Sequence, residues 1–168
     1  MGERRNRSCH IELLTSKLSS QEIVTFLIKN RITPYRDNFH STIYYSESNP
    51  LFQREEFLSK FMFTLPITIF SQTYFFDFFS VGDCLVLRYE NERVRGIKRI
   101  IDKEISRQFR ESGSLNSDER RLLKIYQSQR QVTTYSLFNP HIMLSRYPKV
   151  NLEGLPNFEK QITFDNFK

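Results

Sequence analysis

The sequence predicts a mixed α+β fold, and the order of its segments is the first reason. Strand-like runs at 9–15 and 39–46 flank a helical segment at 19–31, and a β-rich middle at 61–90 precedes two more helical segments. A strand-like run at 159–167 follows. Because helices and strands do not alternate regularly, packed antiparallel layers are expected rather than a doubly wound parallel sheet. The 168 residues suffice for one core, so a single domain over 1–168 is expected.

The first helical segment is amphipathic. Ile23, Phe26 and Leu27 recur at helical spacing. Ser19 or Ser20 is the expected N-cap. Pro34 ends the pattern, because it disfavours helical geometry in the residue before it.

The middle and second half carry both element types. The runs at 61–70, 73–80 and 84–90 predict strands, and Gly82-Asp83 between the last two predicts a hairpin. A helix is then expected up to about Gly113, with these residues on its buried face: Val94, Ile97, Ile101 and Ile105. A further helix is expected over 116–129, and extended segments over 131–138 and 141–147.

The chain is basic, with a formal net charge of +6. The cations concentrate in the segments 90–111 and 118–131. A basic surface attracts polyanions, which makes a nucleotide or RNA a candidate partner. The same composition also suits two amphipathic helices with solvated outer faces.

The cysteines and apolar runs indicate the compartment. Cys9 and Cys84 are far apart and lack metal-ligand spacing, so neither a disulfide framework, a zinc site nor another metal centre is indicated. The N-terminal segment lacks the apolar run of a secretory signal. The most apolar stretch, 61–79, is interrupted by Pro66 and Asp77, which disfavours a membrane span. A cytoplasmic location is expected, in the host cytoplasm if the protein is viral.

Two strand-like runs carry a histidine. In "FHSTIYYS", His40, Thr42 and Tyr44 share one face of a regular strand. In "NPHIMLSRY" the same rule groups His141, Met143 and Ser145, with Ile142, Leu144 and Arg146 on the opposite face. His10, on the first strand, has no hydroxyl residue two positions later and is interpreted as structural.

These two segments resemble the signature strands of the 2H phosphoesterases, which repeat His–x–Thr/Ser and often embed the second copy in Pro-His-Ile-x-Leu. That family includes bacterial cyclic phosphodiesterases related to RNA 2′-5′ ligase, viral enzymes that degrade 2′-5′ oligoadenylate, and phage enzymes that hydrolyse cyclic oligonucleotides of bacterial defence. "NFHSTIYYSES" is most similar to the first strand of the phage enzymes. The order of elements resembles the family over most of the chain, but only the two short motifs are specific.

The resemblance implies a two-lobed fold in which antiparallel sheets line a central cleft and the helices lie outside. It implies that His40 and His141 are the catalytic acid–base pair of a metal-independent phosphodiesterase without a cofactor, and that Thr42 binds the phosphate. Two imidazoles can supply both proton transfers near neutral pH, and hydroxyls can stabilise the charge that grows on the phosphate oxygens. The implied substrates contain a cyclic-oligonucleotide, 2′-5′ or 2′,3′-cyclic linkage.

One position departs from the family pattern. Met143 replaces the second Thr or Ser, and a thioether cannot donate a hydrogen bond. Ser145 is on the expected face but about 7 Å further along the strand. Two alternatives are therefore also open: Met143 weakens the activity, or the site only binds its ligand.

Further substrate contacts are expected beside the two strands. Tyr35 and Tyr147 are candidates for stacking on a base, and Arg36 and Arg146 for phosphate contacts. A role for Arg146 requires the strand to end or bulge before it, because regular alternation turns it away from His141. Each of these residues is also compatible with an ordinary surface or packing role.

Three classes of function remain open on the sequence. The first is the phosphodiesterase, and the second is a non-catalytic homologue that binds a nucleotide or RNA. The third is a protein-interaction domain that uses its basic helices, with both histidines as ordinary strand residues and Thr42 present for its β propensity.

Overall fold

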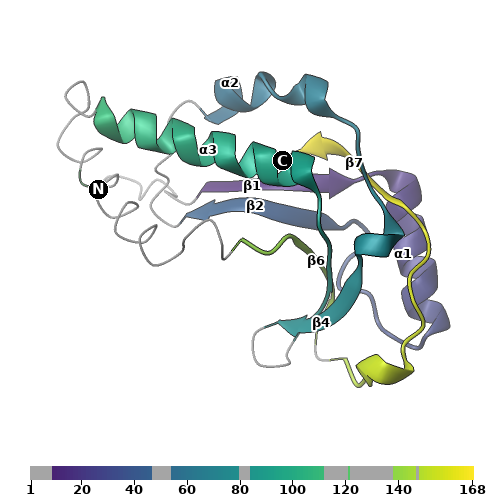
Figure 1. The fold of residues 1–168 in the computed structure, drawn as a ribbon. Helices are drawn as coiled ribbons and strands as arrows, with labels where there is room; N and C mark the ends of the chain where they lie inside the picture. Colours follow the sequence, from purple (N-terminus) through teal and green to yellow (C-terminus); the bar gives the residue numbers. More distant parts are fainter. Residues whose placement is uncertain (1–8, 47–53, 80–83, 112–120, 122–137, 147) are drawn as a thin grey trace, which may run out of the picture.

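The computed structural model describes residues 9–46, 54–79, 84–111, 121, 138–146 and 148–168. Within this part, the strands form two antiparallel sheets (Figure 1). The larger sheet has the order β2-β1-β7-β3, with β2 at His40–Ser46, β1 at Cys9–Thr15, β7 at Ile162–Phe167 and β3 at Ile67–Ile69. The smaller sheet has the order β4-β5-β6, with β4 at Phe75–Phe79, β5 at Cys84–Arg88 and β6 at His141–Arg146. The predicted α+β fold is confirmed.

Helix α1, Lys17–Lys29, follows β1 and begins earlier than predicted. The cap is Ser16, whose side chain accepts a hydrogen bond of 3.1 Å from the backbone N of Ser19. Ser19 and Ser20 are buried within the helix instead. Ser19 Oγ accepts from the backbone N of Thr163 at 2.9 Å, so this serine ties α1 to β7.

Helix α3, Glu92–Arg110, lies along β1 and β2 (Figure 1). The apolar face that the sequence predicts is confirmed, because the four residues on it are buried: Val94, Ile97, Ile101 and Ile105. Their burial against the sheets leaves most of the arginines and lysines of α3 on its outer surface. Among the described residues, no helix has the length and apolar character needed to cross a membrane.

The middle of the chain differs from the prediction in two ways. A strand was expected over 61–70, but Met62–Thr64 forms a 3₁₀ turn and β3 begins only after Pro66, which has no N–H to donate to a ladder. The short helix α2, Arg54–Ser59, was not predicted.

The hairpin prediction is confirmed in its strands, because β4 pairs antiparallel with β5 and Phe79 lies opposite Cys84. Its turn residues Gly82 and Asp83, the helix expected over 116–129 and the extended segment expected over 131–138 lie almost entirely outside the described residues.

Candidate functional site

A cavity of about 620 Å³ opens beside the start of β2. Its walls include His40 and Thr42 of β2, His10 and Glu12 of β1, and Met143 of β6. A second cavity of about 750 Å³ shares Glu12 and His40 with the first. The two adjoining cavities form the candidate functional site.

Glu12 lies between two histidines of this site. Its Oε1 atom is 3.5 Å from Nε2 of His40 and 3.7 Å from Nδ1 of His10. The side chains of Glu12 and His40 are only 14 % and 21 % exposed. Because both side chains are largely shielded from solvent, the carboxylate and the imidazole are weakly screened from one another. His10 is more exposed, and its ring centre lies 4.6 Å from that of Tyr45.

The surroundings of His40 favour its neutral form. Burial lowers the pKa of His40 below its usual 6.5, the carboxylate of Glu12 opposes this, and Arg36 lowers the pKa further. His10 and Lys168 also lower it. At neutral pH the imidazole therefore has a nitrogen free to accept a proton, as a general base requires.

A β-bulge decides which side chains of β2 reach the cavity. Thr42 and Tyr44 pair with consecutive residues of β1, so Ile43 has no partner of its own. Ile43 and Tyr44 are both buried, and Tyr45 returns to the face on which His40 lies. The expectation that Tyr44 shares this face is wrong, because the extra residue reverses the alternation.

The same irregularity occurs in β6, at the same distance from its histidine. Met143 and Ser145 pair with consecutive residues of β5, and Leu144 is skipped. Leu144 and Ser145 are both buried. The expectation that Ser145 shares the face of His141 is wrong for this reason, and the exposed Arg146 takes that face instead.

The strands β2 and β6 are therefore two copies of one pattern. In each, a histidine opens the strand and the third residue after it is skipped by the neighbouring strand. The contents of the copies differ. Thr42 stands opposite Glu12 in the first copy, whereas Met143 stands opposite the fully buried Val86 in the second. The first copy is the polar half of the site, and the second is apolar at the matching positions.

The two copies lie side by side in different sheets (Figure 1). Before the start of β2, the backbone N of Tyr35 donates to O of Leu144, near the end of β6, at 2.8 Å. Toward the other end, Lys98 Nζ lies 5.5 Å from the ring centre of Tyr44 and 5.7 Å from that of Phe138. The two strands therefore run in opposite directions.

Hydrogen bonds of buried hydroxyl groups hold the sheets together beside the site. Ser41 of β2 shares a hydrogen bond of 2.6 Å with the phenol of Tyr89, which follows β5, and both side chains are buried. Ser145 Oγ donates to O of Thr33 at 2.6 Å. Because Ser145 is buried and bonded in this way, its hydroxyl connects the chain before β2 to β6.

His141 lies on the same face of β6 as Met143, but it is not part of the walls of the two cavities. Its Nδ1 atom is 2.8 Å from O of Asn139. Its ring stacks on Phe79, with 5.1 Å between the centroids. The structure thus brings His40, Thr42 and Met143 together in one cavity and places His141 further along the adjacent strand.

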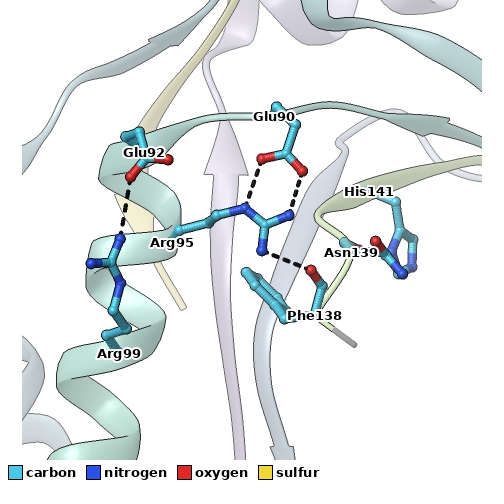
Figure 2. A network of polar contacts seen from close by, with 7 residues as sticks. All are labelled: Glu90, Glu92, Arg95, Arg99, Phe138, Asn139 and His141. Atoms are coloured by element: carbon cyan, nitrogen blue, oxygen red, sulfur yellow. Dashed lines mark hydrogen bonds and ion pairs between the residues drawn. The ribbon is translucent and has the colours of Figure 1, made fainter. Parts of the chain in front are cut away.

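A hydrogen bond from α3 holds the segment that leads into β6 (Figure 2). Arg95 forms a bidentate pair with Glu90 and donates to O of Phe138 at 3.0 Å. The backbone N of Tyr89 also donates to O of Pro140 at 3.2 Å. These contacts fix the position from which His141 enters the strand.

Three of the candidate substrate contacts gather beside the cavities. Tyr35 and Arg36 line both of them. The Cζ atoms of Arg36 and Arg146 lie 4.9 and 4.5 Å from the centre of the Tyr35 ring. Both guanidinium groups donate to the Tyr35 oxygen, at 3.3 and 3.0 Å. Tyr147 lies outside the described residues.

Basic side chains outnumber acidic ones in the lining of the first cavity, where Arg36, Arg54 and Lys168 accompany Glu12. Arg54 itself is paired with Glu55. Of the charged residues in this lining, only Arg36 is a candidate on the sequence alone. Strand alternation could have identified Glu12, which falls two residues after His10. Arg54 and Lys168 come from distant segments, and no local pattern marks them.

Comparisons with protein-family models, curated proteins and solved structures gave no match. The family resemblance therefore depends on the two histidine strands. In the part of the chain that the structure describes, no group of three or more His, Cys, Asp or Glu side chains is arranged to hold a metal ion.

Proposed function

We propose that this protein is a metal-independent phosphodiesterase that acts on a nucleotide or RNA substrate, with His40 and His141 as its acid–base pair. The observation that carries the proposal is the repeated histidine strand. Two strands lie side by side, and each has a bulge at the third residue after its histidine. One of them presents His40 and Thr42 to a cavity that basic side chains line. A chance His–x–Thr on one strand does not account for the second copy.

His40 is the general base in this proposal. It is partly buried and its lowered pKa favours a free nitrogen at neutral pH, so it takes the proton from the attacking water or ribose hydroxyl. Glu12, 3.5 Å from Nε2, stabilises the imidazolium that forms. Its charge thereby offsets part of the cost of burying the protonated ring.

Thr42 and the cavity cations stabilise the phosphate. The Thr42 hydroxyl donates to a non-bridging oxygen, where charge increases in the transition state. Lys168 supplies positive charge at the same cavity. His141 is assigned as the general acid for the leaving oxygen because it occupies the position of His40 in the second copy.

The proposed substrate is a small nucleotide or RNA with a cyclic-oligonucleotide, 2′-5′ or 2′,3′-cyclic linkage. Cavities of about 620 and 750 Å³ are in the size range of small-molecule sites. The resemblance of the first strand to the phage enzymes favours cyclic oligonucleotides.

A non-catalytic nucleotide-binding protein is the second candidate. It is favoured by the apolar character of the second copy, where Met143 and Val86 replace a hydroxyl and a carboxylate. Such a protein would bind the same anions in the same cavity and release them unchanged.

Hydrolysis in the presence of EDTA separates the two candidates. The protein is incubated with 2′,3′-cyclic nucleotides, 2′-5′ oligoadenylate and cyclic di- and trinucleotides, and products are identified by mass. The phosphodiesterase yields a product that disappears in His40→Ala. The binder yields no product from any substrate, although it associates with at least one of them in a salt-sensitive manner.

A further inference from the structure

The guanidinium groups of Arg36 and Arg146 both face Tyr35, and neither has a carboxylate partner among the described residues. Both side chains are exposed. Asp37, the next residue after Arg36, lines the second cavity and forms no ion pair within the described ranges. Several other arginines in the described part of the chain are paired with acids: Arg88 with Asp77, Arg95 with Glu90, and Arg107 with Glu104 and Glu111.

Tyr35 holds these two like charges close together. Each guanidinium lies within 5 Å of the ring centre and donates to the same phenol oxygen. The backbone of Tyr35 is itself fixed to β6 through O of Leu144. Since a guanidinium has five N–H donors, most donors of both groups remain available for an anion. A phosphate suits such a pair, because guanidinium groups bind its oxygens in a bidentate manner.

The paired arginines adjoin the candidate reaction site. Arg36 lines the same cavity as His40 and Thr42, and its charge acts on the His40 imidazole. Arg146 reaches Tyr35 from β6 because the bulge at Leu144 turns it to the face of Met143. The two anion positions, one at His40 and Thr42 and one at the arginines, are therefore neighbours.

We propose that Arg36 and Arg146, held by Tyr35, bind a second phosphate of the substrate beside the phosphate that reacts at His40. The inference depends on the proposed function for the first position. It identifies the substrate class as an oligonucleotide or a nucleotide with at least two phosphates, in place of a nucleotide with a single cyclic phosphate. The ring of Tyr35 then serves to hold the arginines instead of stacking on a base.

Calorimetric titration with two ligands that differ by one phosphate tests this inference. Adenosine 3′-monophosphate and adenosine 3′,5′-bisphosphate share base and sugar, and neither has a diester bond to hydrolyse. The wild-type protein is expected to prefer the bisphosphate by about tenfold or more, the effect of one charge-assisted contact. The double variant Arg36→Gln/Arg146→Gln is expected to lose this preference.

Lys103→Gln/Lys160→Gln is the matched control. It removes the same charge at two exposed lysines outside both cavities, and it is expected to keep the preference. Equal binding of the two ligands by the wild-type protein would overturn the inference, and so would an undiminished preference in Arg36→Gln/Arg146→Gln.

Salt dependence provides a second measurement. The affinity for a short linear oligoadenylate should fall with salt less steeply in Arg36→Gln/Arg146→Gln, by about 0.7 in the log–log slope for one phosphate that is no longer neutralised. An unchanged slope counts against the second phosphate position. If the wild-type protein hydrolyses no substrate but prefers the bisphosphate, the phosphodiesterase proposal fails. The second phosphate site is then a feature of a non-catalytic binding protein.

Discussion

Glu12 and His40 form a close pair on neighbouring strands, with 3.5 Å between Oε1 and Nε2. Glu12 is also the cross-strand partner of Thr42. Residues directly opposite one another in antiparallel strands point to the same side, so the carboxylate lies on the same side as the histidine and the hydroxyl. This relationship gives the cavity its chemical character and can be tested without a known substrate.

The variant Glu12→Gln should lower the pKa of His40 further. The carboxylate is the one neighbour identified as raising this pKa, and glutamine keeps the size of the side chain without the charge. NMR titration of the His40 ring measures the change. Glu153→Gln, which removes an exposed carboxylate outside the cavities, is the control. A His40 pKa that is unchanged or raised in Glu12→Gln would contradict the pairing.

The lowered pKa of His40 predicts a loss of stability as the pH falls below about 6.5. Between the folded and unfolded pKa values the unfolded chain binds more protons at this residue, so the free energy of unfolding decreases with acidification until both states are protonated. His40→Gln should reduce this dependence. Urea unfolding at about pH 7.5 and about pH 5 provides the comparison. Equal dependence in both proteins would show that His40 is not the titrating group.

Met143→Thr should increase the turnover of the preferred substrate. A threonine places a hydroxyl in the position that corresponds to Thr42 in the first copy. One added hydrogen bond to a charged transition state corresponds to about a ten- to hundredfold higher rate. Steady-state kinetics of Met143→Thr and of the apolar control Met143→Leu measure the effect. If the two variants have the same rate, the methionine does not limit the reaction.

Removal of the Tyr89 hydroxyl should destabilise the protein by about 1–3 kcal/mol, because it leaves the buried Ser41 hydroxyl without this partner. The double variant Tyr89→Phe/Ser41→Ala should lose less than the sum of the single variants, since neither unpaired hydroxyl remains. Chemical denaturation of the four proteins completes the cycle. Additive losses would mean that the two hydroxyls do not stabilise one another.

Local patterns predict the regular part of this fold well. The strands at 9–15 and 39–46 and the apolar face of α3 follow from side-chain periodicity within one segment. The predicted N-cap, Ser19 or Ser20, lies three or four residues after the cap in the structure, Ser16. Several serines occur close together here, and only the fold shows that Ser19 bonds to β7.

Local sequence patterns do not predict the two bulges, because each bulge depends on how the strand pairs with β1 or β5. On the sequence, a role for Arg146 requires the strand to end or bulge before it, and a bulge occurs at Leu144. The same bulge turns Ser145 into the buried interior, whereas regular alternation predicts it on the face of His141. The contact between Glu12 and His40 likewise joins residues far apart in the sequence, and periodicity alone does not reveal it.

In the proposed mechanism, His40 and His141 act together on one phosphodiester. Turnover numbers of His40→Ala, His141→Ala and the double variant test it most directly, measured in EDTA on the substrate that the wild-type protein cleaves. Groups that act as a unit have non-additive effects. Each single variant is expected to lose nearly all activity, and the double variant is expected to be no slower than the slower single variant. Full activity in His141→Ala, with activity lost in His40→Ala, would contradict it.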